Sequence, residues 1–186
     1  NNLTIASNVL ISKLRVLNNK NVGIFSSQCI NYLIEDTIID GTIAGGTGPS
    51  VGTVTALFIG NNPASGSSVN NTESFNVKMI RTTISNTSNF VYSGTNPASS
   101  GGVRACRAQN INCLVVSDCI FTDSEVKAHS SATLNPTQSF CANFVGASLQ
   151  NAVIENCKFL NVRADKFVRY TENFHSSGNV NSLVGI

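Results

Sequence analysis

The chain has 186 residues, of which 41% are apolar and only 12% are charged, and its formal net charge is +2. This apolar content is typical of a globular protein with a core, whereas so few charges disfavour exposed amphipathic helices, which need Glu, Lys and Arg on their wet face. The small net charge gives no support to nucleic acid as a partner, and apolar runs of four or five residues are too short for a membrane span.

One short pattern recurs along the chain. Counted from its first residue, the pattern has an aliphatic residue at position 1, a polar residue at position 3 and a small or apolar residue at position 4. An apolar residue follows at position 6 and a turn-forming residue at position 8. The last two copies lie within VVSDCIFTD and VIENCKFLN, and in chain order the copies begin at Ile11, Ile34, Met79, Val116 and Ile154. Alternation over so few positions predicts short β-strands bounded by turns.

The spacing of the copies indicates a repeat. The first interval, from Ile11 to Ile34, is 23 residues, and the later intervals of 45, 37 and 38 residues are interpreted as the same unit with inserted loops. A second segment also recurs, because Ile24, Cys106 and Phe144 each lie ten residues before the next copy. We interpret GIFSS, ACRAQ and NFVGA around these residues, and TALFI and KFVRY in the other units, as a further strand. Each unit then holds about three short strands separated by Asn, Gly and Ser turns.

A period of this length with several short strands predicts an all-β fold, a right-handed parallel β-helix (β-solenoid) of about five coils with inserted loops. The alternative all-β fold is a β-sandwich or jelly roll, which also has short strands at regular spacing. The segments IENCKFLN and VSDCIFTD resemble coils of the pectin-lyase-like superfamily of parallel β-helices. The resemblance covers roughly Val9 to Tyr170 and implies a fold without naming an activity.

Three inserted loops follow the same strand of consecutive coils and are predicted to stack along one side of the solenoid. They are the segments 41–53, 86–102 and 123–139, whereas a fourth loop, 61–74, leaves from another corner. Repeat proteins often bind partners where insertions accumulate. Aromatic rings beside amides and hydroxyls suit sugars, so the candidate glycan-binding residues are Phe90, Tyr92, Asp123, Glu125 and His129. The alternative is that Phe90 and Tyr92 cover the flank of the solenoid.

The polar position of the repeat is the candidate for chemistry. Its members are Lys13, Asp36, Arg81, Asp118 and Asn156. On coils about 4.8 Å apart these groups would interact. They could form the active face of a lyase, with Asp118, Arg81, Asp36 and Lys13 as catalytic candidates, or a ladder that keeps the coils in register.

Hydrolysis of a glycosidic bond would need two carboxylates about 5 to 10 Å apart, and two short-range acidic pairs could supply them. These pairs are Asp36 with Asp40 and Asp123 with Glu125. The motifs expected of a polygalacturonase or a pectin methylesterase are absent from the sequence.

The six cysteines are interpreted as structural. No C-x-x-C pair occurs and only two histidines are present, so we expect no metal site, and no cofactor motif is found. Cys119 and Cys157 share one inward column, Cys106 is aligned with Ile24 and Phe144, and Cys29 with Ile111 and Leu149. Four of the six thus resemble small core hydrophobes, which favours reduced thiols and folding in a reducing compartment.

These observations favour a structural or receptor- or glycan-binding β-helix module of a surface assembly such as a virion spike, phage tailspike or adhesin. The first residue is not Met, so we interpret residues 1–186 as a single domain cut from a longer chain. Localisation at a virion or cell surface and assembly as a homotrimer are expected by analogy. The alternative function is a polysaccharide lyase or glycoside hydrolase acting on a surface polysaccharide.

Overall fold

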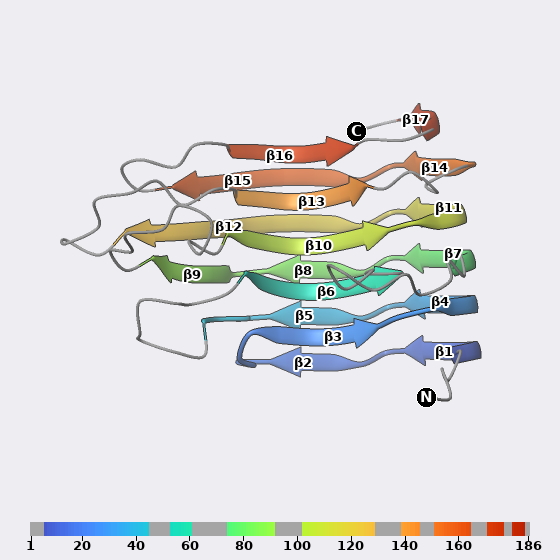
Figure 1. Cartoon of the computed structure of the whole chain (residues 1–186), viewed down its shortest axis with the longest axis horizontal. Helices are drawn as coiled ribbons and strands as arrows, with labels where there is room; N and C mark the ends of the chain where they lie inside the picture. Colours follow the sequence, from blue (N-terminus) through green and yellow to red (C-terminus); the bar gives the residue numbers. More distant parts are fainter. Residues whose placement is uncertain are drawn as a thin grey trace, which may run out of the picture.

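A computed structural model describes residues 6–44, 53–60, 74–91, 102–128, 139–145, 151–164, 171–176 and 180–184. Within these ranges the regular secondary structure is entirely β-strand, and every strand pair is parallel (Figure 1). The sandwich and jelly-roll alternatives are built from antiparallel pairs. The all-β prediction is therefore confirmed, and the parallel pairing agrees with the solenoid interpretation.

The strands form three parallel sheets, which we name A, B and C. Sheet A contains β1 (Ala6–Ser12), β4 (Cys29–Glu35), β7 (Ser74–Ile80), β11 (Ile111–Ser117), β14 (Ala152–Glu155) and β17 (Val180–Val184). Sheet B contains β2 (Arg15–Leu17), β5 (Ile38–Asp40), β8 (Thr83–Ser85), β12 (Ile120–Ala128) and β15 (Lys158–Ala164), with β9 (Thr87–Val91) paired to β12. Sheet C contains β3 (Val22–Ser26), β6 (Val54–Gly60), β10 (Val103–Gln109), β13 (Ser139–Val145) and β16 (Thr171–Ser176).

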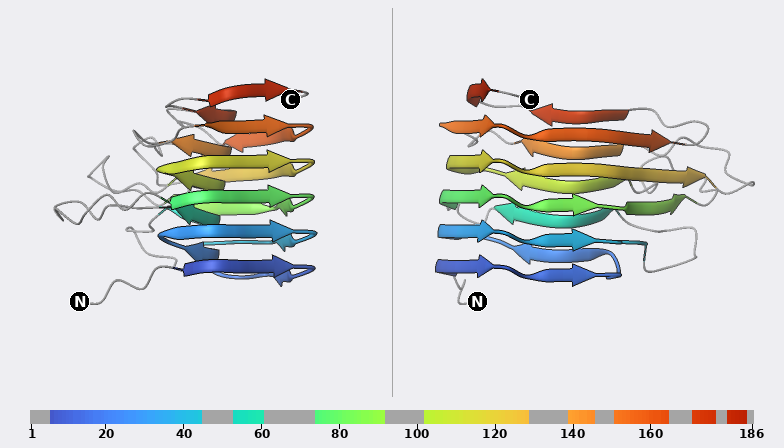
Figure 2. Two further views of the ribbon diagram at one scale, coloured as in Figure 1. Left: turned by 90° about the vertical axis from the view of Figure 1, so that its right-hand side faces the viewer. Right: turned by 180° about the vertical axis from the view of Figure 1, so that it is seen from behind.

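The chain visits sheets A, B and C in turn, and each round adds one strand to each sheet, except that coil three adds both β8 and β9 to sheet B. We call one such set a coil: coil one is β1 to β3, coil two β4 to β6, coil three β7 to β10, coil four β11 to β13 and coil five β14 to β16. Parallel strands need a long crossover, and here the strands of the other two sheets provide it. Figure 2 shows the coils as successive levels of one stack.

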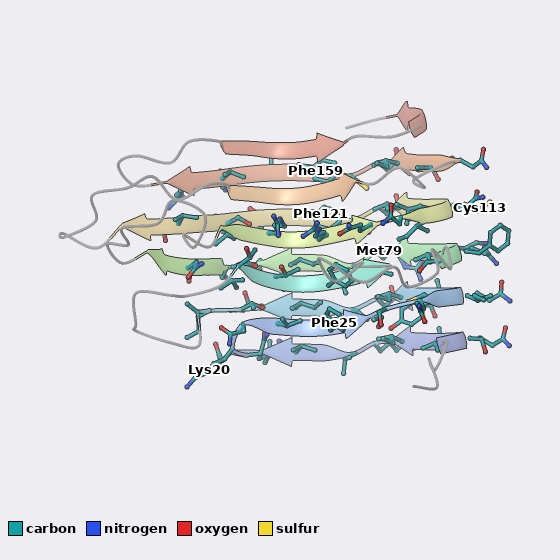
Figure 3. All side chains as sticks on the ribbon, in the orientation of Figure 1. Lys20, Phe25, Met79, Cys113, Phe121 and Phe159 are labelled. Atoms are coloured by element: carbon teal, nitrogen blue, oxygen red, sulfur yellow. The ribbon has the colours of Figure 1, made fainter. Side chains whose placement is uncertain are left out.

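The columns predicted from the sequence are confirmed by the strand register. The first column contains Ile11, Ile34, Met79, Val116 and Ile154. The second contains Val16, Ile39, Ile84, Phe121 and Phe159. Their members on coils two to five are buried in one core cluster. The rings of Phe121 and Phe159 stack with centroids 5.1 Å apart (Figure 3), so neighbouring coils are joined through like side chains.

The polar column lies at the corner between sheets A and B, and all of its members have a left-handed backbone. Their φ values fall between 47° and 56°, for Lys13, Asp36, Arg81, Asp118 and Asn156. Asn and Asp tolerate this region better than other L-residues, which accounts for their abundance at the corners. The residue after each corner points inward, and in four coils its side chain bonds the carbonyl two positions earlier, for Thr37, Thr82, Cys119 and Cys157.

The third predicted column is partly wrong. Ile24 and Cys106 do share a column through Leu57, but the partner of Cys106 on the next coil is Ala142, and Phe144 pairs with Ala108. The prediction assumed ten residues between this column and the next copy, whereas Ala142 lies twelve residues before Ile154, so the link from β13 to β14 is two residues longer than expected. Leu149 and the KFVRY segment lie outside the described residues, and the sheet C strand of coil five is β16.

Candidate functional site

A surface hollow of about 160 Å³ lies on sheet B. Its walls are polar and come from three consecutive coils, with Asn86, Ser88, Asp123, Glu125 and Arg163 lining it. Two of these residues, Asp123 and Glu125, are among the glycan-binding candidates predicted from the sequence. The hollow is therefore the candidate functional site.

Strand register places the lining residues. Ser88 on β9, Glu125 on β12 and Arg163 on β15 lie directly in line across three coils. Asp123 has a left-handed backbone with φ 57°. This bend leaves Asp123 partly exposed between the buried Phe121 and Ser124, and regular alternation then leaves Glu125 partly exposed two positions later. A corner in the backbone thus brings two carboxylates of one strand to the same hollow.

Hydrogen bonds hold the carboxylates near the hollow in place. Asp123 accepts bonds from the Thr122 hydroxyl at 2.9 Å and from the Asn161 amide at 3.3 Å. One coil away, the Asn86 amide and the Ser85 hydroxyl each donate to Asp40 at 2.7 Å, and these two bonds lower the pKa of the Asp40 carboxyl. The site offers carboxylates, an amide, a hydroxyl and one guanidinium, which together accept and donate hydrogen bonds as a polyhydroxylated ligand requires.

The sequence located two of the site residues but misjudged their backbone. Asp123 and Glu125 were predicted in a loop, whereas β12 continues through both and pairs with β9 and β15. Phe90 also lies on a strand, opposite Lys127. Its side chain, Tyr92 and His129 lie outside the described residues, so a role for these aromatic and imidazole rings stays a prediction.

Three lining residues were missed by the sequence reasoning. Asn86 had been assigned only as a turn former, and Ser88 only as part of a loop. Arg163 follows Glu125 by 38 residues, the same interval that separates the last two copies of the repeat. Extending the column alignment two residues beyond the turn-forming position of the repeat would have joined Ser88, Glu125 and Arg163.

The polar column at the A–B corner forms an ion pair between coils. Arg81 donates from Nε to Asp36 Oδ1 at 2.6 Å and from Nη2 to Asp36 Oδ2 at 2.9 Å, with a further contact of 3.4 Å to Glu35. The hydrogen bonds from Arg81 lower the pKa of Asp36, and the charge of Lys13 contributes. Asp118 accepts from the Ser117 hydroxyl at 2.6 Å. This geometry is that of the register ladder, and a catalytic role for the same residues is an untested prediction.

The cysteines behave as the sequence predicted where their side chains are described. Cys29, Cys106, Cys119 and Cys157 are free and buried, and Cys113 is free and partly exposed. Burial raises the pKa of the Cys29 thiol to about 11, so this thiol is protonated and unreactive at neutral pH. Among the described residues, no three His, Cys, Asp or Glu side chains are placed to hold a metal ion.

Comparison with protein-family models, with curated proteins and with solved structures finds no match to this chain. The protein is therefore classed by its fold alone, as an all-β chain whose described strands form three parallel sheets, with a polar hollow on one of them. A search of the described part of the chain finds no helix long and apolar enough to cross a membrane.

Proposed function

We propose that the chain is a right-handed parallel β-helix of the pectin-lyase-like kind that binds a glycan in the hollow on sheet B. The observation that carries this proposal is the convergence of Asp123, Glu125 and Arg163, with the amide of Asn86 and the hydroxyl of Ser88, in one hollow. Carboxylate oxygens and side-chain amides are suited to sugar hydroxyls because they accept and donate in fixed directions. Ser88, Glu125 and Arg163 lie on paired strands, which keeps this part of the site preorganised and lowers the entropic cost of binding.

The wider role that we propose is a structural and receptor-binding module of a surface assembly, such as a virion spike, tailspike or adhesin. The low charge of the chain and its high content of Asn, Ser and Thr support it. Assembly as a homotrimer and location at a virion or cell surface extend the proposal by analogy with other solenoids.

Binding to a panel of neutral and acidic glycans tests the proposed site. The double variant Asp123→Asn/Glu125→Gln removes both carboxylates with little change in shape, and we expect it to weaken binding at least about tenfold, or about 1.4 kcal/mol. The matched control is Asp118→Asn/Glu155→Gln, which removes the same charge at the A–B corner. Loss of binding in the control and not in the hollow variant would place the site on the polar column instead.

The same incubations test the alternative function. Two carboxylates in one hollow also favour a glycoside hydrolase, and the charged column is what the lyase hypothesis would use. New reducing ends or unsaturated uronates would establish turnover. Turnover abolished by Asp118→Ala would overturn the purely structural role, whereas binding without turnover would overturn the enzyme.

A further inference from the structure

The hollow on sheet B takes its described lining from three consecutive coils, and each coil contributes a different kind of group. Asn86 and Ser88 belong to coil three, Asp123 and Glu125 to coil four, and Arg163 to coil five. Figure 1 shows the strands concerned, β9, β12 and β15, on successive levels. Paired strands lie about 4.8 Å apart, so the hollow extends about 10 Å along the stack. The two carboxylates occupy its middle, with neutral side chains on one side and a cation on the other.

The charge of the described lining is negative. Asp123 and Glu125 contribute two carboxylates, and Arg163 contributes the single cation among the described lining residues. The hydrogen-bond donors described for Asp123 are the Thr122 hydroxyl and the Asn161 amide. Both donors are neutral, so they orient this carboxylate without cancelling its charge. The middle of the hollow therefore repels an anionic ligand and attracts a cationic one.

Hydrogen-bond acceptors also outnumber donors in the described lining. The Asn86 amide nitrogen donates to Asp40 at 2.7 Å, which leaves the amide oxygen of Asn86 as an acceptor for a ligand. The two carboxylates only accept, the Ser88 hydroxyl does either, and Arg163 only donates. A ligand hydroxyl brings one donor and two acceptors, whereas a protonated amine brings three donors and no acceptor. The amine is therefore the better complement to this lining.

The two carboxylates are close enough to share one bound cation. Asp123 and Glu125 are two residues apart on β12, which is at most about 7 Å along a strand, and both line the hollow. Both residues are also partly buried, so water and salt screen their attraction for a cation less than they would screen fully exposed carboxylates. An ammonium group between them would contact a carboxylate on either side.

We propose that the glycan bound in the hollow carries a protonated amine, as an amino sugar without its acetyl group does, and that Asp123 and Glu125 select it. This inference rests on the proposed glycan-binding function and names the class of glycan. Hydroxyls beside the amine meet Asn86 and Ser88 on one side and Arg163 on the other. Because Arg163 repels a second cation, a single amine among hydroxyls fits the hollow better than a polyamine or a run of lysines does.

The experiment uses the whole chain and three matched tetrasaccharides, the β-1,4-linked oligomers of glucosamine, N-acetylglucosamine and glucose. Their rings and linkages are the same, and they differ only in carrying an ammonium, an acetamide or a hydroxyl group. Isothermal titration calorimetry at low salt, with EDTA and at about pH 6, keeps the amine protonated and removes divalent cations. The glucosamine oligomer is expected to bind at least about fivefold more tightly than the other two, and salt should reduce this preference.

Charge variants locate the preference for the amine. Asp123→Asn/Glu125→Gln is expected to bind the glucosamine and glucose oligomers alike, and Asn suits the left-handed backbone at position 123. The matched control Asp118→Asn/Glu155→Gln changes the net charge equally and should keep the preference.

The cation of the hollow should act in the opposite direction. Arg163→Gln removes the repulsion of the ligand amine and is expected to raise the preference for glucosamine about twofold to threefold. Lys158→Gln, which removes an exposed cation from the same strand outside the described lining, should leave the preference unchanged.

The outcomes separate this inference from the proposed function. Glycan binding that Asp123→Asn/Glu125→Gln weakens, but without a preference for the amine, would overturn the amino sugar and leave the glycan site standing. A preference that survives in this variant would also overturn the inference. No binding of these oligomers or of the wider glycan panel would overturn the proposed function itself. Tighter binding of the peptide acetyl-Gly-Lys-Gly-Lys-Gly-amide than of the glucosamine oligomer would identify a basic polypeptide as the partner and overturn the amino sugar.

Discussion

The corner residues Asp36 and Arg81 combine an unusual backbone with an ion pair between coils. Both have positive φ, and Arg81 holds Asp36 with two hydrogen bonds. The lowered pKa of Asp36 means that its carboxylate favours the folded state. The stabilisation is fully present above the ordinary pKa of Asp, about 3.9, and is lost as the pH falls through the lower value of the folded state.

Arg81→Gln is therefore expected to lower the thermal unfolding midpoint slightly at pH 7, because both groups are exposed and screened by water. The difference from the unsubstituted chain should shrink in high salt and should be smaller at pH 2 than at pH 7. Circular dichroism melts at the two pH values measure it, with Lys78→Gln as a control for the loss of one exposed cation. A difference that is the same at both pH values would show that the pair with Asp36 is not its cause.

For these corner residues the sequence predicted which side chains lie on adjacent coils, but it did not predict their backbone conformation. The repeat predicted that Asp36 and Arg81 lie on adjacent coils, because they are as far apart along the chain as Ile34 and Met79, which begin the same two copies. It did not reveal their left-handed conformation, since Lys13 and Arg81 occupy positions where the backbone favours Asn, Asp or Gly. Tertiary stacking overrides the local preference there.

An asparagine ladder crosses the outer end of sheet A and has one gap. The Asn31 amide donates to Asn8 at 3.1 Å and the Asn76 amide donates to Asn31 at 2.8 Å. Cys113 follows in the same register, with φ 61° (Figure 3). A thiol at this position cannot continue the chain of amide bonds and is less suited than Asn to the left-handed region.

Cys113→Asn is expected to stabilise the fold by about 0.5–1 kcal/mol, since it adds an amide link and suits the backbone. Urea unfolding measures the change, and Cys113→Ala is the control that removes the thiol without adding an amide. If the Asn variant is no more stable than the Ala variant, the ladder does not extend through coil four.

At the scale of whole elements, the sequence predicted that the strands exist but not where all of them end. The short strands of sheets A and B were predicted because their apolar columns repeat. The extension of sheet B into β9 and the far half of β12 was not, because Ser, Asn and Thr there read as loop residues. Their inward side chains Thr87, Asn89 and Ser124 are polar and fully buried, so the apolar signal that identifies a strand is missing. The hollow lies beside this extension, which explains why only part of it was found.

As a whole, the molecule is a stack in which each coil is stabilised mainly by its immediate neighbours. Inward residues of the central coils have coils on both sides, whereas those of coil one have a described neighbour on one side only. Ile11 is accordingly only partly buried, while Ile34, its partner in register on coil two, has no exposed surface. In such quasi-one-dimensional proteins stability is close to a sum of coil and interface contributions.

The same substitution should therefore cost different amounts on neighbouring coils. Ile34→Ala leaves a cavity enclosed by coils on both sides, so we expect it to lower the free energy of unfolding by about 3–4 kcal/mol. Ile11→Ala removes the same atoms from a column that is open on one side, where the transfer gain is already incomplete, and about half that cost is expected. Urea unfolding of the two variants at one protein concentration measures the difference. Equal costs would show that Ile11 is enclosed as fully as Ile34 in solution.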